Sequence, residues 1–227
     1  MEMEDRKKQL RFGSFRSLQP LVHSFKFEGQ CIDRYYIDGF LSGHAVDIRG
    51  HVLEIGDDTY TRRFGGAGVV QSDVLNAVEG NPNATVVADL TDASHLTSDT
   101  FDCFICTQTL QYIYDVRAAV RTIHRILKPG GVVLATFPGI AHISRYDMEH
   151  WGEYWRFTSM AARRLFEDVF LPKNVEVFPY GNVLVAMSFL HGLPADELKQ
   201  EELDYRDLDY EVVIAVRAVK MKGTKSL

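Results

Sequence analysis

The stretch His51-Val-Leu-Glu-Ile-Gly56 decides the fold, because it reads as a buried strand that ends in an acidic residue and a glycine turn. Two more acidic residues follow predicted strands: Asp73 after a strand near 68–72, and Asp89 after a strand at 84–88. In a parallel α/β sheet, ligands bind just outside the carboxyl ends of the strands. Three successive strands that each end in a carboxylate therefore predict one site with three polar anchors.

The bulk properties favour a soluble protein of enzyme size. At 227 residues, one domain with appended segments is expected. Hydrophobic residues make up 46% of the chain, enough for a sizeable core, and no apolar run approaches membrane-spanning length. Residues 1–8 lack the apolar centre of a signal peptide, and three cysteines suit a reducing compartment, so a cytoplasmic location is expected. The net charge of -6 argues against binding to nucleic acid.

The Cys-x-x-Cys pattern at Cys103 and Cys106 lies inside a predicted strand. On a strand, residues three apart face opposite sides of the sheet, so the two thiols are not expected to meet. Buried core thiols are therefore predicted here, and no metal site.

Predicted strands and helices alternate along the chain, which predicts a parallel core sheet in a single domain at 30–227, after a flexible segment at 1–29. The expected elements are a helical cap at 30–46, strands at 51–55, 68–72, 84–88, 101–106, 132–136, 175–178 and 210–217, and helices at 59–64, 116–127 and 159–170. Asp115 and Thr158 precede the last two helices as N-caps. An irregular stretch at 137–157 and a helical stretch at 181–209 are expected as insertions on the substrate side.

Taken together, residues 30–220 resemble a class I S-adenosylmethionine-dependent methyltransferase of the type that modifies small molecules and sugars. The matching segments, in order, are Val52–Gly56, Ser72-Asp73, Ala88–Leu90, Phe101–Leu110, Arg125–Val132 and Trp151–Thr158. The resemblance implies a Rossmann-like, three-layer αβα fold with a seven-stranded, mostly parallel sheet whose last strand is antiparallel. It also implies S-adenosylmethionine as the cofactor, whose amine, ribose diol and base suit three polar anchors.

Residue by residue, the resemblance implies a role for each anchor. Glu54 would hold the methionine amino group, directly or through water, and Gly56 would let the cofactor approach the backbone. Asp73 would accept both ribose hydroxyls, which needs two carboxylate oxygens. Asp89 would take the exocyclic amine of adenine, with the backbone of Leu90 beside it.

The first turn departs from the family pattern of glycine-x-glycine-x-glycine, since it runs Gly56-Asp-Asp-Thr-Tyr60. Asp58 and Tyr60 replace small residues and should narrow the cleft. Alternatively, Asp57 or Asp58 adds a carboxylate against the methionine ammonium. A nicotinamide-binding enzyme would want Gly-x-Gly-x-x-Gly at this turn, and the acidic residue before the first glycine would repel a pyrophosphate.

The end of the fourth strand carries Thr107 and Gln108, which the resemblance places near the transferable methyl group. No Asp/Asn-Pro-Pro-Tyr/Phe signature follows this strand, where Thr107-Gln-Thr-Leu110 stands instead. Methylation of a nucleobase amine is therefore disfavoured.

The substrate is expected at the segment after the fifth strand. His142 is the favoured general base for a hydroxyl acceptor, with His150 and Asp147 as the next candidates. Trp151 and Tyr154 would wall the pocket, since apolar faces of sugars stack on aromatic rings; packing of a lid against the domain is an equal alternative.

The sequence thus predicts a methyltransferase that binds a small polar molecule, with O-methylation of a sugar or glycosylated natural product as the expected reaction. Neither a nucleic acid nor a membrane is an expected partner. The alternative is a non-catalytic module of methyltransferase-like fold that partners a glycosyltransferase, which the altered first turn would favour.

Overall fold

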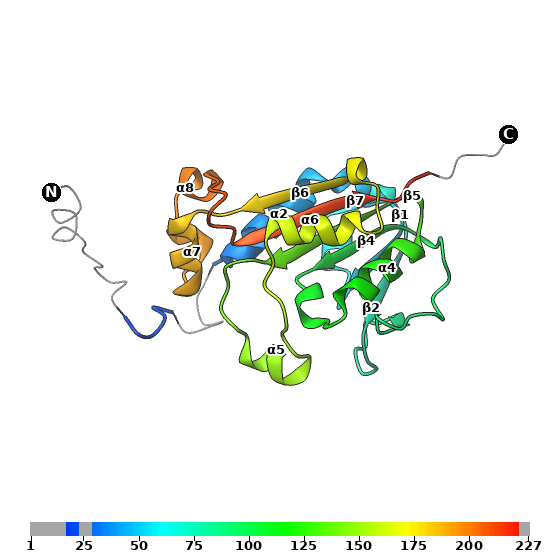
Figure 1. Ribbon diagram of the computed structural model, residues 1–227, viewed down its shortest axis with the longest axis horizontal. Coiled ribbons are helices and arrows are strands. Elements are labelled where there is room, and N and C mark those ends of the chain that lie inside the picture. Colours follow the sequence, from blue (N-terminus) through cyan, green and yellow to red (C-terminus); the bar gives the residue numbers. More distant parts are fainter. Residues whose placement is uncertain (1–16, 23–28, 223–227) are drawn as a thin grey trace.

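The computed structural model describes residues 17–22 and 29–222, so the flexible segment predicted at 1–29 lies mostly outside the described residues. Its centre is a seven-stranded sheet with the order β3-β2-β1-β4-β5-β7-β6 (Figure 1). The strands are β1 (Gly50–Ile55), β2 (Val69–Asn76), β3 (Val86–Val87), β4 (Phe101–Thr107), β5 (Leu127–Pro138), β6 (Val175–Tyr180) and β7 (Val213–Val219). β7 pairs antiparallel with β5 and β6, and the remaining pairings are parallel. The predicted Rossmann-like sheet with an antiparallel last strand is confirmed.

Helices cover both faces of the sheet. They are α2 (Ile32–Gly43), α3 (Thr59–Phe64), α4 (Val116–Ile126), α5 (Arg145–His150), α6 (Ser159–Glu167), α7 (Val183–Leu190) and α8 (Gln200–Asp204). Buried residues of α4 and α6 share one core cluster with the sheet, and those of α2 and α7 share another. In Figure 1, α4 and α6 lie in front of the sheet and α2 lies behind it. α7 and α8 lie at the left, beyond the arrowhead of β6 at the carboxyl edge of the sheet, and α5 lies at the bottom of the picture.

Helices α4 and α6 begin where the sequence predicts. The side chain of Asp115 accepts the N–H of Ala118 at the start of α4, and Thr158 accepts the N–H of Ala161 at the start of α6. An N-cap side chain satisfies one of the backbone donors that the first turn leaves free. The buried residues of α4 are Ala119, Val120, Ile123 and Ile126, which share one face of the helix.

The Cys-x-x-Cys prediction is also confirmed. Cys103 and Cys106 are both fully buried, and they belong to the two different core clusters on opposite faces of β4. Burial raises the pKa of each thiol, so both are inert core groups. Within residues 17–22 and 29–222, no helix is long and apolar enough to cross a bilayer.

Two predicted strand boundaries are wrong by four residues or more. β2 does not end at residue 72, because its ladder with β1 continues through Leu53↔Asp73 to Ile55↔Leu75. The fifth strand begins at Leu127 and not at residue 132, so β5 includes the Lys-Pro-Gly-Gly segment at 128–131 with an irregular register. Backbone hydrogen bonds join Gly130 and Gly131 to Lys220.

Candidate active site

A cavity of about 660 Å³ lies at the carboxyl edge of the sheet. Gln108 after β4, Pro138 at the end of β5 and Val213 at the start of β7 form its floor. The other walls come from the N-terminus of α2, the α5 segment, the end of α7 and residues 20 and 22, and include Arg34, Gln111, Tyr112, His142, Ile143, Asp147, Glu153, Phe189 and Leu193. The structure therefore brings together three predicted residues from separate segments: Gln108, His142 and Asp147.

Asp147 is one of the acidic residues that line this cavity, and its carboxylate has a side-chain partner there. The hydroxyl of Tyr112 donates to Oδ2 of Asp147 at 3.3 Å. Burial and the neighbouring carboxylate raise the pKa of Tyr112 to about 12, so the phenol keeps its proton and remains a donor. His142 also lines the cavity and is exposed, with its ring centroid 6.1 Å from that of Phe189. A half-buried carboxylate and an exposed imidazole thus face the same space.

Three other predicted substrate residues do not line the cavity. His150 is exposed at the end of α5, where its ring stacks on Tyr146 at 4.1 Å and Nδ1 lies 2.7 Å from the carbonyl of that residue. Trp151 and Tyr154 are 45% and 52% exposed, and Tyr154 makes an edge contact with Tyr114. Neither aromatic residue lines this cavity, and their contact with a substrate stays a prediction.

The turn after β1 holds Gly56 at a φ of +83°, in the left-handed region. Its N–H donates to the carbonyl of Leu75 at 3.0 Å, and its carbonyl accepts from the side-chain amide of Asn81 at 2.6 Å. A Cβ built at Gly56 would meet nothing within 4 Å. The glycine therefore leaves open space beside a fixed backbone, which fits close approach of a ligand.

Glu54 lies beneath this turn and is 2% exposed. Its carboxylate accepts the backbone N–H groups of Tyr60 and Thr61, at 3.0 and 2.7 Å, and the hydroxyl of Thr61 at 2.7 Å. Burial raises the pKa of Glu54, against the lowering effect of these hydrogen bonds. The carboxylate is thus engaged in holding the start of α3 rather than presented to a ligand.

The unusual residues of the turn are partly paired. Oδ1 of Asp57 accepts the N–H of Thr59 at 2.8 Å, and Asp58 forms an ion pair with Arg62 at 2.8 Å. The ring of Tyr60 stacks on Phe64, and its hydroxyl accepts from Arg34 at 3.2 Å. Tyr60 therefore reaches toward α2, and through Arg34 it connects the turn to the wall of the cavity.

Asp73 lies inside β2, three positions before the strand ends at Asn76. Oδ2 lies 2.5 Å from Nε2 of His51 and 3.1 Å from Nε2 of Gln71, and Oδ1 accepts the hydroxyl of Thr85 at 2.8 Å. The strand-end position expected for Asp73 is wrong, and the protein itself supplies partners to both of its oxygens.

The remaining predicted cofactor residues lie near strand ends. Asp89 is exposed, and its Oδ1 accepts the N–H and hydroxyl of Thr91, both at 2.8 Å. Leu90 is buried in the core, which leaves only its backbone for ligand contact. Thr107 is the last residue of β4, directly before Gln108.

Sequence reasoning missed three polar residues of this region: Asn76, Asn81 and Gln111. Asn76 occupies the true end of β2, and Asn81 fixes the Gly56 carbonyl. Gln111 is 2% exposed in the short 3-10 helix η4 (Leu110–Tyr112) and lines the cavity. Its spacing of three from Gln108 was the one available signal. Within the described part of the chain, no three His, Cys, Asp or Glu side chains gather to hold a metal ion.

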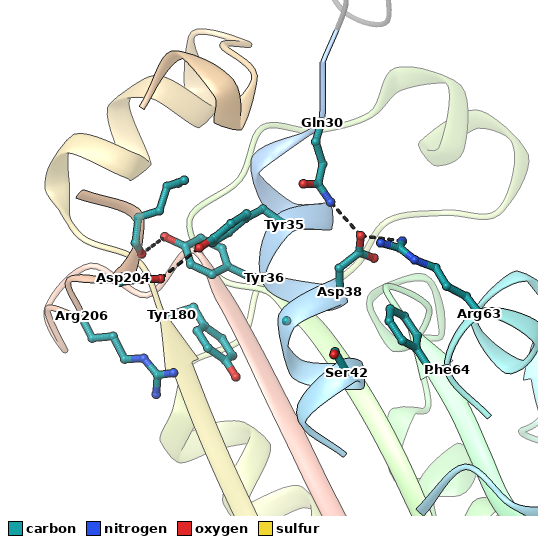
Figure 2. Close-up of a pocket in the computed structure, with 12 residues that line it drawn as sticks. Gln30, Tyr35, Tyr36, Asp38, Ser42, Arg63, Phe64, Tyr180, Asp204 and Arg206 are labelled. Atoms are coloured by element: carbon teal, nitrogen blue, oxygen red, sulfur yellow. Dashed lines mark hydrogen bonds and ion pairs between the residues drawn. The ribbon is translucent and has the colours of Figure 1, made fainter. Parts of the chain in front are cut away.

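Figure 2 shows a second cavity, of about 560 Å³, against the outer side of α2. Gln30 and Arg63 both reach Asp38, at 2.8 and 2.6 Å, and Tyr35 donates to Asp204 at 3.0 Å. These polar groups pair with one another, and none of the predicted site residues lines this cavity. The larger cavity at the carboxyl edge is therefore the candidate site.

Comparison with known families gives a match for residues 45–135, to the model described as a methyltransferase domain. This segment spans β1 to most of β5 and so includes the turn at Gly56 and the end of β4. No curated protein matches the chain.

Solved structures share the fold at low identity. An S-adenosylmethionine-dependent methyltransferase from Mesorhizobium loti is 19% identical with a TM-score of 0.53, over 81% of this chain and 100% of that one. Phosphoethanolamine N-methyltransferase 2 of Haemonchus contortus, solved with phosphomonomethylethanolamine and S-adenosylhomocysteine, is 16% identical with a TM-score of 0.51, over 84% of this chain and 59% of that one. A methyltransferase in complex with the Haloferax volcanii activator Trm112 is 16% identical with a TM-score of 0.52, over 85% of this chain and 94% of that one.

At these identities the solved structures show the fold alone. The inference about the type of reaction rests on the match to the methyltransferase domain. The methyltransferase domain at residues 45–135, set in this Rossmann-like fold, supports an enzyme of the methyltransferase class with S-adenosylmethionine as its cofactor.

Proposed function

We propose that this protein methylates a hydroxyl group of a small polar acceptor, with a sugar or glycosylated natural product as the expected class. The observation that carries the proposal is the cavity of about 660 Å³, where Gln108, His142 and Asp147 meet beside the carboxyl end of β4. Its walls combine polar groups with apolar side chains such as Ile143 and Phe189, which suits a molecule with hydroxyl groups and apolar faces. The net charge of -6 favours a small molecule over nucleic acid, and we expect a cytoplasmic enzyme.

The residues at the carboxyl ends of β1 to β4 fit the cofactor. The open, left-handed turn at Gly56 gives room for the methionine part, and polar groups occupy the ends of the next strands. The residues that would hold it are Gly56, Asp57, Asp58, Asn76, Asp89, Leu90, Thr107 and Gln108. When bound, S-adenosylmethionine supplies a methyl group on a positively charged sulfur. We assign the ribose contact to Asn76 rather than Asp73, because Asn76 is the residue at the strand end.

The cavity residues would align the acceptor and take its proton. His142 is the proposed general base, since its imidazole faces the cavity and is open to a ligand. Asp147, oriented by the hydroxyl of Tyr112, would bind an acceptor hydroxyl. Phe189 and Leu193 would exclude water from the cavity. Alignment of the acceptor with the methyl group would then supply a large part of the rate enhancement.

Binding and transfer can be tested separately. Calorimetry with S-adenosylhomocysteine tests the cofactor site, and incubation with methyl-labelled S-adenosylmethionine and a library of sugars and glycosides tests transfer. We expect binding, and label in an ether-linked product identified by mass spectrometry. Binding without transfer to any hydroxyl compound would favour the non-catalytic module, and absence of binding would reject both the cofactor site and the reaction.

A further inference from the structure

Two side-chain amides, those of Gln108 and Gln111, lie together on the wall of the cavity. Nε2 of Gln108 and Oε1 of Gln111 are buried and have no hydrogen-bond partner among the described residues. Buried polar atoms are normally paired, so an open donor beside an open acceptor needs an explanation.

The orientation of both amides is set by the bonds they do make. Nε2 of Gln111 donates to the backbone carbonyl of Gln108 at 3.0 Å and to its Oε1 at 3.3 Å. Two facing amides can form a reciprocal pair of hydrogen bonds, and here only one of the two is formed. The remaining donor and acceptor therefore belong to two amides that are already joined to each other.

Backbone hydrogen bonds hold both Gln108 and Gln111 in place. Gln108 has a φ of +45°, and its N–H is held by the carbonyl and hydroxyl oxygens of Thr136 at 3.0 and 3.2 Å. The carbonyl of Gln111 accepts the N–H groups of Tyr154 and Trp155. A left-handed conformation at a residue other than glycine is strained, and such strain gathers at ligand sites.

We propose that the Gln108–Gln111 amide pair recognises the hydroxyl groups of a neutral acceptor, with Nε2 of Gln108 donating and Oε1 of Gln111 accepting. This assignment rests on the proposed function, in which the cavity is the acceptor site. A hydroxyl group both donates and accepts, so it satisfies both open atoms. A carboxylate has no proton for Oε1 of Gln111, and an ammonium has no lone pair for Nε2 of Gln108. The pair thus selects neutral polyols such as sugars over amines and acids.

Nuclear magnetic resonance of the side-chain amides tests this directly, because both residues carry NH₂ groups. Four probes that share one apolar ring are titrated at millimolar concentration: cis-1,2-cyclohexanediol, cyclohexylamine, cyclohexanecarboxylate and cyclohexanecarboxamide. We expect the diol to shift the Gln108 and Gln111 signals more than the amine and the acid do, and the carboxamide, which also donates and accepts, to shift them as well. No shift with the diol, or an equal or larger shift with the amine or the acid, would overturn the proposal.

Variants of Gln108 and Gln111 then test whether these two side chains bind the diol. Gln111→Met removes the open acceptor, and Gln108→Met removes the open donor, so either should weaken diol binding about 10-fold, the usual effect of one hydrogen bond of about 1.4 kcal/mol. Two variants are used so that a folding defect in one leaves the other informative. Gln200→Met, on the exposed side of α8, is the matched control and should bind the diol like the parent. Unchanged diol affinity in a folded Gln111→Met or Gln108→Met protein would reject the role.

The diol titration is run with and without S-adenosylhomocysteine, which separates the two proposals. Failure of S-adenosylhomocysteine to bind would reject the proposed methyltransferase reaction while leaving the hydroxyl preference measurable. Conversely, normal cofactor binding with no diol preference would reject the amide-pair proposal alone. A loss of S-adenosylhomocysteine affinity in both Met variants, with diol affinity intact, would assign the pair to the cofactor instead.

Discussion

Nε2 of His51 lies 2.5 Å from Oδ2 of Asp73, and this contact ties the beginning of β1 to the middle of β2. Thr85, which precedes β3, donates its hydroxyl to the other oxygen of the same carboxylate. Asp73 therefore joins three neighbouring parts of the sheet. The position of Asp73 in the motif implies a contact with the ribose, but in the structure this carboxylate links strands of the sheet.

This role predicts a loss of stability at low pH. Burial raises the pKa of Asp73, but the hydrogen bonds from His51 and Thr85 outweigh it, so the pKa lies below its ordinary value. A depressed pKa means that the ionised group stabilises the fold above the unfolded pKa of about 3.9, and that this contribution is lost as the pH falls through the folded value. Asp73→Asn should lower the free energy of unfolding at pH 6 and differ little from the parent near pH 2, in urea titrations. A constant difference across this range would contradict the prediction.

The ribose contact can be assigned by comparing two positions on the same strand. Asn76 lies three residues beyond Asp73, about 10 Å along the strand and nearer the carboxyl edge. We expect Asn76→Ala to weaken S-adenosylhomocysteine binding about 10-fold, the effect of one lost hydrogen bond, and Asp73→Asn to weaken it much less. Calorimetry with S-adenosylhomocysteine on both variants shows whether Asp73, the motif residue, or Asn76, the residue at the strand end, contacts the ribose. A larger loss in Asp73→Asn would restore the original assignment.

The fold was largely predictable because its elements repeat clear patterns. Asp115 and Thr158 mark helix starts by local chemistry, and the apolar stretch before Gly56 predicts the first strand without information from distant residues. The end of β2 was not predictable, because Asp73, a charged residue after the polar Gln71 and a serine, read as the end of the strand. The partners that make a charged residue acceptable inside this strand come from β1 and from Thr85, and their proximity arises only in the folded sheet.

The site was predictable only in part, for a similar reason. The segment at 137–157 has no periodicity, so the sequence favoured His142 over His150 without showing which of them lines a cavity. Formation of α5 separates them, leaving His142 in the lining and turning His150 outward. Gln111 gave no signal of its own, because its significance depends on the buried amide of Gln108 beside it.

Replacement of Glu54 should destabilise the turn after β1, because its carboxylate holds the start of α3. In Glu54→Gln an NH₂ group replaces one oxygen and faces a backbone donor of Tyr60 or Thr61, so we expect unfolding to become easier by about 1–3 kcal/mol. Thr61→Val removes only one hydroxyl donor and should cost about 1 kcal/mol. Chemical denaturation measures both. Equal stability of Glu54→Gln and the parent would show that the carboxylate does not hold α3.

The open space at Gly56 allows a matched pair of glycine variants. Gly56 and Gly66 both have φ in the left-handed region, at +83° and +54°, and a Cβ at either would meet nothing within 4 Å. Each alanine variant should therefore lose a similar stability, about 1–2 kcal/mol, from backbone strain. If the cofactor lies against the first turn, Gly56→Ala alone should weaken S-adenosylhomocysteine binding, by at least about 10-fold. Equal affinity in the two variants would place the cofactor elsewhere.

His142 and His150 provide the sharpest test of the proposed chemistry, because they lie on the same segment and only His142 lines the cavity. Loss of a general base lowers turnover by about 100- to 10,000-fold, and His142→Ala should show this with the acceptor found by the transfer assay. Its affinity for S-adenosylhomocysteine should be nearly unchanged, since the cofactor residues lie on other segments. His150→Ala should keep the parent turnover. Asp147→Asn should raise the KM for the acceptor more than it lowers kcat, if the carboxylate only binds substrate. Retained turnover in His142→Ala with a collapse in Asp147→Asn would make Asp147 the base, and retained turnover in both would mean that alignment within the cavity is sufficient for transfer.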